Sequence, residues 1–339
     1  MTMPAGPLLE VRDLTVSFRS ARGWRPSRRQ TISAVDGVSL SIASREVLSV
    51  VGESGCGKST LARTIVRLET ATSGRVLFEG DDLLRLSGRA LRRRRRHIQM
   101  VFQDPFSSLS PRQTVETMLV EPMDVHGIGT PSDRRDRAVD LLGRVGLDPS
   151  ALSRYAFQFS GGQRQRIAIA RALAVEPRLL LCDEPISALD VSIRAQILNL
   201  LHDLRHTLGL SYLFIAHDLA AVRHVSDRVA VMYLGRIAEM APAEELFAHP
   251  THPYTRALWS AAPVPNPAIE RRRRRIILRG ELPNPAEPPS GCRFRTRCPI
   301  ATDRCSAETP ALREVSPGHA VACHHAERAV SEPALQISA

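Results

Sequence analysis

Short apolar runs and longer stretches of helical periodicity alternate along most of this chain. The apolar runs have the length of strands buried on both faces, and they occupy residues 46–51, 178–182, 211–216 and 228–233. Stretches with apolar residues at helical spacing occupy residues 59–68, 164–173 and 191–208. This alternation predicts an α/β core built around a sheet.

Two further regions extend the predicted core. Residues 8–18, 34–42 and 74–80 are predicted strands, of which the first alternates as an edge strand does. Residues 98–103 are predicted to form a strand that Asp104 and Pro105 end. From 106 to about 160 the apolar spacing is helical and prolines mark the joints. That stretch is therefore predicted to be a helical insertion.

The chain changes character after about Pro242, where prolines become frequent and four of the six cysteines are found. We expect a principal domain over residues 8–245, with the helical insertion at about 106–160. Residues 246–330, called here the cysteine module, are predicted to form a separate small unit. Residues 1–7 and 331–339 are predicted to be flexible tails.

A glycine-rich segment joins the predicted strand at 46–51 to the predicted helix at 59–68. It matches the pattern G-x-x-x-x-G-K-[ST], in which backbone N–H groups surround nucleotide phosphates, and glycines permit the close backbone approach. Lys58 is expected to neutralise phosphate charge, and Ser59 to bind Mg²⁺. This phosphate loop, the predicted nucleotide-binding element, comprises Gly52, Glu53, Ser54, Gly55, Cys56, Gly57, Lys58, Ser59 and Thr60.

Two carboxylates end the apolar run at 178–182, and ligands of open α/β sheets bind beyond the carboxyl ends of the strands. Asp183 is suited to hold Mg²⁺ directly or through water. Glu184 is suited to polarise a water that attacks the γ-phosphate, with His217 as its partner at the leaving phosphate. Without a phosphate loop in the same chain, a solvated carboxylate pair and a structural histidine would be the better interpretations.

A second predicted anion site precedes the helix at 164–173. Its residues are Ser160, Gly161, Gly162 and Gln163. Hydroxyl and backbone N–H groups at a helix N-terminus bind anions. A single domain does not need two phosphate-binding elements, but a dimer uses both if each domain supplies residues 160–163 to the other's nucleotide.

Composition narrows the classes of protein without deciding among them. The 339 residues contain no apolar run of about eighteen residues and no signal-peptide pattern, so we expect a cytoplasmic protein without a membrane span. The net charge of +11 comes largely from arginine runs at 92–96 and 271–275, which suit a solvated face or one near anionic lipid. Aromatic content of 4% argues against a nucleic-acid stacking platform.

The motifs together resemble the ATP-binding domain of ABC transporters. The resemblance is carried by residues 52–60, Gln103, residues 160–163, Asp183, Glu184, residues 187–190 and His217. It implies a P-loop NTPase (RecA-like) core, with an antiparallel β edge and a helical insertion, that hydrolyses ATP with Mg²⁺. It also implies that Gln103 links Mg²⁺ to the membrane subunit and that Asp190 lies at the dimer interface. Phe18 is implied to stack on adenine, and packing in the core is the alternative for this residue. Arg45 stands at a turn position where the family usually has glycine.

Some segments resemble one branch of the ABC transporters more closely than the superfamily as a whole. Residues 52–60, 159–166, 249–258 and 291–299 resemble the oligopeptide/dipeptide importers, and residues 163–172 resemble their F-type ATPase subunit. The implied function is to power the uptake of di- or oligopeptides. The same machinery serving nickel, heme or opine-type solutes is the alternative. A soluble ABC ATPase acting on nucleic acid or ribosomes fits less well, because the chain has one set of motifs and no sustained heptads.

The implied partners are other proteins at the membrane. They are a paralogous D-type ATPase subunit, two integral-membrane permease subunits and an extracellular or periplasmic solute-binding protein, with no nucleic acid. The implied location is peripheral, on the cytoplasmic face of the inner (cell) membrane.

The cysteine module carries Cys292, Cys298, Cys305 and Cys323. Their spacing matches neither the usual zinc-finger nor the ferredoxin pattern, so spacing alone leaves an undefined metal site and buried structural thiols as alternatives. Some peptide importers of this family carry a [4Fe–4S] cluster here, and that resemblance makes the cluster the first choice and Zn²⁺ the second. His324 and His325 are candidate substitutes for one ligand.

Overall fold

The computed structural model describes residues 6–19, 31–262, 275–278 and 280–327. The chain divides into two compact units. The first consists of Met1–Leu9, Ile42–Val47 and Leu77–Ile215, and the second consists of Glu10–Ser41, Leu48–Val76 and Ala216–Ala339. Within the described residues every helix is too short or too polar to cross a lipid bilayer.

The first unit contains three parallel strands, β6 (Ile98–Val101), β7 (Leu179–Asp183) and β8 (Ser211–Ile215). β7 lies between the other two, and both β7 and β8 are buried along their whole length. Burial on both faces explains why these strands are apolar runs and not alternating ones. The carboxyl ends of the three strands share one edge, which positions the segments that follow them.

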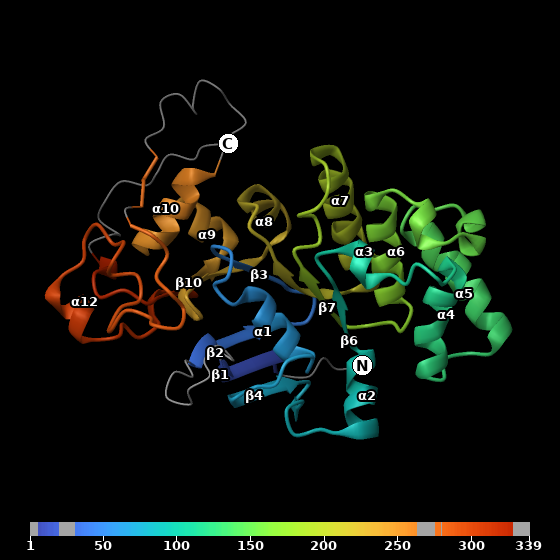
Figure 1. Ribbon diagram of the computed structural model, residues 1–339, viewed down its shortest axis with the longest axis horizontal. Helices are drawn as coiled ribbons and strands as arrows, with labels where there is room; N and C mark the ends of the chain where they lie inside the picture. The colour runs from blue at the N-terminus through green and yellow to red at the C-terminus, as the bar shows by residue number, and fades with distance from the viewer. Residues whose placement is uncertain (1–5, 20–30, 263–274, 279, 328–339) are drawn as a thin grey trace, which may run out of the picture. The chain divides into compact units, whose positions relative to one another are not determined.

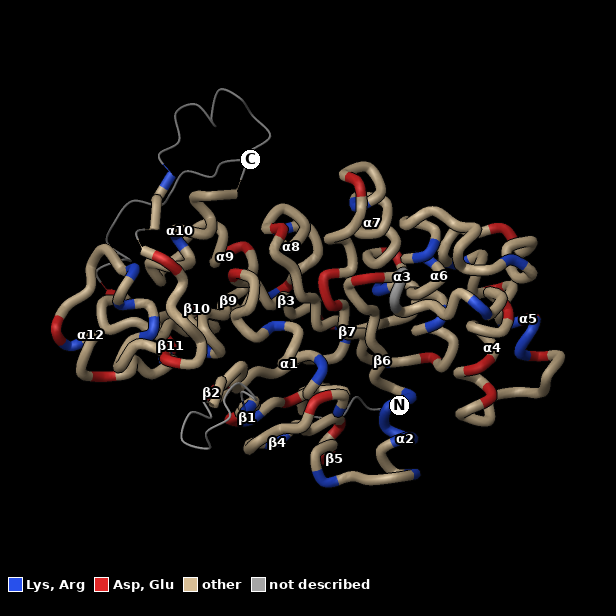
Figure 2. Tube along the Cα trace, in the orientation of Figure 1, with Lys and Arg blue, Asp and Glu red and all other residues tan. Residues whose placement is uncertain are grey.

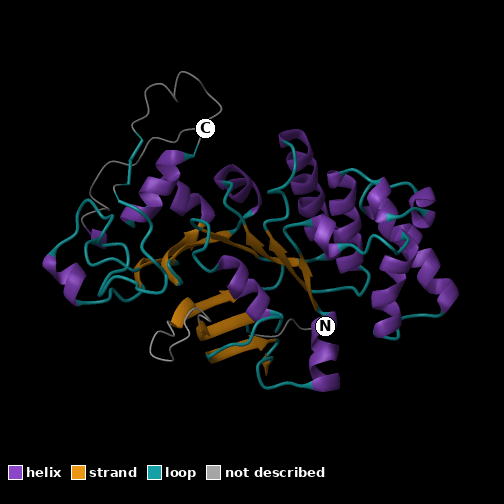
Figure 3. Ribbon diagram, viewed as in Figure 1, coloured by secondary structure: helices purple, strands orange, loops and turns teal. Residues whose placement is uncertain are grey.

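Helices make up most of the rest of the first unit, and α4 and α5 pack beside α6 (Figure 1). The helices of this unit are α2 (Gly88–Arg96), α3 (Pro105–Ser108), α4 (Val115–Val125), α5 (Pro131–Arg144), α6 (Gly161–Leu173) and α7 (Val191–Leu208), with short 3₁₀ turns η2 (Pro149–Ser153) and η3 (Ala156–Gln158). Between β6 and α6 no β-strand occurs, as Figure 3 shows, apart from an isolated bridge between Thr114 and Tyr155.

Local sequence sets the ends of these helices. At α5, Thr130 and Asp133 form a reciprocal capping box, and Pro131 occupies the first turn, where its missing N–H costs nothing. At α7, buried Ile197, Leu201 and Leu204 form the apolar stripe. Gly209 ends that helix in the left-handed conformation, with φ of 66°.

The second unit contains two groups of strands. One group is antiparallel and consists of β2 (Thr31–Ile42), β1 (Leu9–Arg19) and β4 (Ser73–Phe78). In it β1 lies between β2 and β4. The last two residues of β4 pair with the two-residue strand β5 (Asp81–Asp82) within the first unit.

The other group continues from the phosphate loop's strand into the cysteine module. β3 (Val47–Val51) runs parallel to β9 (Arg228–Tyr233), which pairs antiparallel with β10 (Arg236–Pro242). β10 in turn pairs with β12 (His319–Val321), and β12 with β11 (Arg313–Ser316). The helices of this unit are α1 (Lys58–Ile65), α8 (Leu219–Val225), α9 (Ala243–Ala248), α10 (Pro253–Ala261) and α12 (Asp303–Ala307).

The basic character noted in the sequence is concentrated at α2, which Figure 2 shows as a continuous run of Lys and Arg colour. α2 has no buried residue, so its arginines form a solvated face. Arg94 is bonded to Glu79 and Asp81, and Arg96 lies 3.8 Å from Glu176. Of the second run only Arg275 lies within the described residues.

Candidate active site

The phosphate loop connects buried β3 to α1 through two glycines whose positions exclude any side chain. A Cβ on Gly52 would lie 2.2 Å from the carbonyl oxygen of Met232. A Cβ on Gly57 would lie 2.0 Å from the carbonyl oxygen of Ala34, and Gly57 has φ of 106° at the N-cap of α1. The loop therefore rests directly on backbone of β2 and β9, and glycine is required at both places.

Lys58 opens α1 and turns back over the loop that precedes it. Its side chain is buried, and its ammonium donates to the carbonyl oxygens of Gly52 at 2.8 Å and Glu53 at 3.0 Å. Cys56 contacts the same ammonium through its sulfur at 3.8 Å, and burial raises the pKa of the Cys56 thiol. A buried cation beside the N-terminus of α1, together with the loop's backbone N–H groups, suits an anionic ligand.

The two carboxylates at the carboxyl end of β7, Asp183 and Glu184, lie in different surroundings. Asp183 is fully buried at the end of the strand, while Glu184 is partly exposed. Glu184 has φ of 47°, an unfavourable value for a residue with a side chain. Its N–H donates to the Ile215 carbonyl at 3.0 Å, and its Oε2 accepts from Gln103 Nε2 at 2.9 Å. The fold thus brings together Gln103 and Glu184, which the sequence separates by 81 positions.

Residues 160–163 begin α6 as a capping box. The Ser160 hydroxyl accepts from the Gln163 N–H at 3.4 Å, and the Gln163 side chain accepts from the Ser160 N–H at 3.0 Å. Both side chains are exposed, whereas Gly162 is buried and a Cβ there would lie 2.5 Å from Ile193. The predicted second anion site is therefore a solvent-facing helix N-terminus.

The remaining predicted residues lie at exposed positions. Asp190 is the exposed N-cap residue of α7, and the next residue, Val191, is 79% exposed. Phe18, near the end of β1, is 40% exposed, so it is not a core residue of the folded chain. His217 follows β8 and is exposed. The predicted site residues are divided between the two units. The first unit contains Gln103, residues 160–163, Asp183 and Glu184, and the second contains Phe18, the phosphate loop and His217.

The four cysteines of the module lie in one electrostatic neighbourhood. Burial raises the pKa of Cys298 and of Cys323 to about 11, and Cys292 and Cys305 add to both shifts. His325 approaches the Cys305 sulfur at 3.7 Å through its Nε2 atom. However, the described residues contain no group of three or more His, Cys, Asp or Glu side chains arranged to hold a metal ion. The structure therefore gives the [4Fe–4S] and zinc predictions no support.

Two residues that the sequence did not single out contact the phosphate loop. Tyr254 and Arg297 both bond to Glu53. Tyr254 lies within residues 249–258, and Arg297 within residues 291–299, two segments that carried the family resemblance. That resemblance was the available signal, but nothing in either segment indicates a contact with a loop more than 200 positions away.

Comparison with known families identifies two regions of the chain. A model described as ABC transporter matches residues 35–187. A model described as the C-terminal region of oligopeptide/dipeptide transporters matches residues 238–305. The first match includes the phosphate loop, Asp183 and Glu184. The second includes most of the cysteine module.

Individual relatives match nearly end to end. A peptide import ATP-binding protein of Brucella ovis is 53% identical over 321 residues, which are 95% of this chain and 98% of that protein. The oligopeptide transport ATP-binding protein AppF of Bacillus subtilis is 51% identical over 318 residues, with 94% and 97% covered.

Among solved structures, the dimeric ATP-binding cassette MJ0796 in a post-hydrolysis state with ADP and Pi resembles this chain with a TM-score of 0.62. It is 29% identical, and the match covers 69% of this chain and 98% of that one. The likeness confirms the predicted fold class, an α/β nucleotide-binding core with an antiparallel sheet and a helical insertion. The predicted domain boundaries stay a prediction.

Proposed function

Because the chain belongs to the ABC transporter ATP-binding family, and to its oligopeptide/dipeptide branch, we propose that it is the ATP-hydrolysing subunit that powers peptide import through separate membrane subunits. The observation that carries this function is a match over about 95% of the chain to peptide import ATP-binding proteins, with the transporter-specific region at 238–305 included. The resemblance and the ATPase activity predicted from the sequence are thereby confirmed.

We assign the phosphate side of the reaction to the second unit's loop. Lys58 is buried and donates to the carbonyl groups of the loop, which supports a role for its charge at the β- or γ-phosphate. The oxygen donors suited to Mg²⁺ are the Ser59 hydroxyl, the Gln103 amide oxygen and the Asp183 carboxylate. Mg²⁺ would supply charge neutralisation at the phosphates when bound.

We assign the activation of water to Glu184. Its carboxylate is held by Gln103 in the first unit, and a carboxylate fixed by a neighbour is suited to take a proton from an attacking water. His217, exposed after β8, is proposed as its partner on the leaving phosphate. Phe18 is proposed to stack on adenine, which its exposed ring permits.

The nucleotide site is proposed to be shared between two ATPase subunits. The Ser160 and Gln163 side chains cap their own helix and face solvent, which supports contact with a nucleotide held by another subunit. Asp190 at the exposed start of α7 is proposed to lie at the same interface. The partner ATPase is proposed to be a paralogous D-type chain.

The other proposed partners are the proteins that peptide import requires besides the ATPase subunits. We propose two integral-membrane permease subunits, a solute-binding protein outside the membrane, and a peripheral location at the inner face of the cell membrane. For the cysteine module, the [4Fe–4S] cluster and its zinc alternative stay predictions. Iron, sulfide and zinc analysis of protein purified anaerobically checks them, and a metal-free protein with parental ATPase activity would remove both.

Transport by the assembled complex tests the function. Vesicles containing the permease subunits, both ATPase subunits and the solute-binding protein should accumulate a labelled oligopeptide only when ATP is supplied. Replacing this chain by its Glu184→Gln variant should stop accumulation. ATP-dependent uptake of nickel, heme or an opine with no uptake of any peptide would contradict the proposed cargo while leaving the ATPase assignment intact.

A further inference from the structure

Glu53, the second residue of the phosphate loop, is held by two side chains from the C-terminal part of the chain. Arg297 Nη1 donates to both carboxylate oxygens of Glu53, at 3.1 and 2.8 Å. The N–H of Glu53 donates to the Tyr254 hydroxyl at 2.9 Å. Tyr254 is fully buried, and the Arg297 side chain is only 10% exposed. The Glu53 side chain is 27% exposed, so the ion pair is partly buried and solvent screens it only in part.

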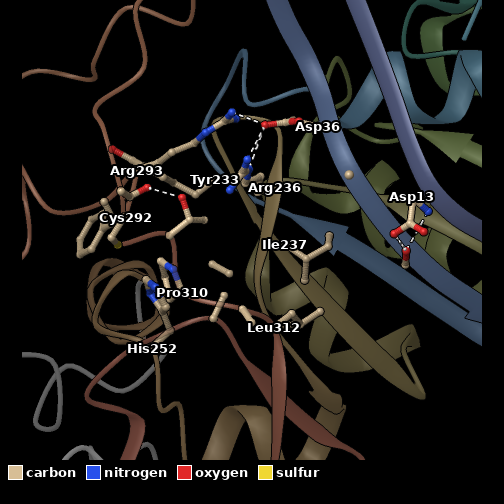
Figure 4. A pocket seen from close by; sticks show the side chains of 18 residues that line it. Asp13, Asp36, Tyr233, Arg236, Ile237, His252, Cys292, Arg293, Pro310 and Leu312 are labelled. Atoms are coloured by element: carbon tan, nitrogen blue, oxygen red, sulfur yellow. Dashed lines mark hydrogen bonds and ion pairs between the residues drawn. The ribbon is translucent and has the colours of Figure 1, made fainter. Parts of the chain in front are cut away.

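The middle of the loop, at Cys56, is held through a turn. The N–H of Gly235 donates to the Cys56 carbonyl at 2.9 Å. Leu234, which precedes it between β9 and β10, has φ of 42°, and its carbonyl oxygen accepts from Arg293. Arg293 also bonds to Asp36 of β2, and Arg236 bonds to the same carboxylate. Figure 4 shows both interactions. The cysteine module therefore reaches Cys56 through one intervening turn.

Both arginines come from a segment that is itself fixed by packing. Phe294 lies between them in sequence and is 2% exposed. Its ring centroid lies 5.3 Å from that of Tyr233 and 5.5 Å from that of Tyr254, and the two tyrosine rings are 4.7 Å apart. An aromatic cluster of this kind restricts rotation of each ring. The segment from 291 to 298 is thus a rigid support and not a loose tail.

This support acts on two properties that a phosphate site needs. Backbone N–H groups bind an anion well only if they are fixed before it arrives, because ordering them later costs free energy. A carboxylate beside the phosphates would also repel the nucleotide unless a cation neutralises it. Arg297 neutralises Glu53 and anchors it, and Arg293 anchors the turn that bonds to Cys56.

We propose that the segment from 291 to 298 is a working part of the ATP-binding site, with Arg297 as the positioning residue that holds the phosphate loop through Glu53. The inference rests on the proposed role of residues 52–60 as the phosphate loop. It makes ATP affinity depend on a segment that lies beyond residues 35–187, the part matched by the ABC transporter model. Arg297 does not act on the reacting atoms, so its loss changes nucleotide binding more than turnover.

The test measures ATP affinity of the full-length chain and the KM and kcat for ATP of the assembled transporter. Arg297→Met should raise the dissociation constant and KM about tenfold or more, because a hydrogen-bonded ion pair to Glu53 is lost. The kcat value should change less than about twofold if the effect is confined to binding. Arg297→Lys, which keeps the charge, should recover part of the affinity.

The matched control is Arg295→Met. Arg295 lies in the same segment, but the hydrogen bonds that the structure describes for its side chain go to Ser290, at 2.9 Å to the carbonyl and 3.3 Å to the hydroxyl. Its variant should bind ATP as the parent does. If both variants lose affinity equally, the segment acts through general stability and the proposal fails.

A double-mutant cycle separates positioning from misfolding. In a Glu53→Gln background, Arg297→Met should weaken ATP binding by less than about twofold, because the shared ion pair is already gone. An undiminished loss in that background overturns the proposal. Lys58→Ala tests the underlying assignment separately: if that variant still binds ATP at the parental affinity, residues 52–60 are not the phosphate loop, whatever Arg297 does.

Discussion

The side-chain amide of Gln103 donates a 2.9 Å hydrogen bond to Glu184 Oε2, which joins the segment after β6 to the segment after β7. The two strands are parallel neighbours, with Val101 opposite Cys182, so both segments leave the same edge. The positive φ of Glu184, 47°, places its backbone in the sparsely populated left-handed region. The Glu184 carboxylate thus has a hydrogen-bond partner in Gln103 that its own fold supplies.

Glu184→Gln should separate binding from hydrolysis. The amide oxygen of glutamine can still accept from Gln103, so the local geometry survives while the proposed base is lost. We expect unchanged ATP affinity, turnover reduced by roughly 100- to 10,000-fold, and accumulation of the closed dimer with ATP. Phosphate release and size-exclusion chromatography with ATP measure the two effects.

Glu176→Gln is the control for that substitution. Glu176 is a carboxylate of the same unit whose partners are Arg96 and Arg137 at the surface. Its variant should hydrolyse ATP at the parental rate. Parental turnover by Glu184→Gln would instead show that the catalytic role lies elsewhere.

ATP turnover per chain should rise with protein concentration and with added partner subunit. Residues 160–163 face solvent at the start of α6, so a nucleotide site that needs them is complete only in a dimer. Ser160→Arg should abolish this increase by placing a bulky side chain at the contact. Ser153→Arg, at another exposed serine of the insertion, should leave it intact. Constant turnover per chain at every concentration would argue for a site within one subunit.

Arg45→Gly should stabilise the fold. Arg45 has φ of 64°, and the turn uses its backbone, whose N–H donates to Ser211 Oγ at 2.7 Å and whose carbonyl accepts from Arg205. Glycine keeps these bonds and removes the steric cost of a side chain there, so the free energy of unfolding should rise by about 1 kcal/mol. Arg45→Ala retains the strain and should show no such gain. Chemical denaturation measures both variants.

The sequence predicted best those elements whose apolar pattern reflects their burial. The predicted bounds of α7 and β9 agree with the structure, since an apolar stripe or a buried run marks their whole length. α2 was missed as a helix because it buries no residue and so has no apolar stripe. Its arginines bond to Glu79 and Asp81, contacts that periodicity does not reveal.

β10 was missed for a different reason, because a charged residue interrupts its apolar pattern. Glu239 is fully buried there, and it accepts from the N–H groups of Thr251 and His252 at 2.7 and 2.9 Å. His319 of β12 lies 2.7 Å from the same carboxylate. These partners come from later parts of the chain, so the sequence did not reveal that β10 pairs with β12. For the same reason, short motifs marked residues 52–60 as the candidate phosphate loop but did not reveal the contact of Glu53 with Arg297, 244 positions away.

The stability of the second unit should fall with acid through His252. This residue is 3% exposed, and its Nδ1 accepts from the Tyr254 N–H at 3.0 Å, which requires an unprotonated nitrogen. Burial lowers its pKa to about 4, against the opposing charge of Glu239. Because the unfolded state has the ordinary pKa of about 6.5, it binds the proton first, and stability is lost as pH falls from about 6.5 to 4.

The loss attributable to His252 should reach about 3 kcal/mol at pH 4 and be absent above pH 7. His252→Asn retains an acceptor for the Tyr254 N–H and does not titrate, so its free energy of unfolding should fall less steeply over the same range. Urea denaturation of parent and variant at half-unit steps of pH gives the difference. Parallel curves for the two proteins would mean that His252 is not held neutral by its burial beside Phe294, whose ring centroid lies 5.6 Å away.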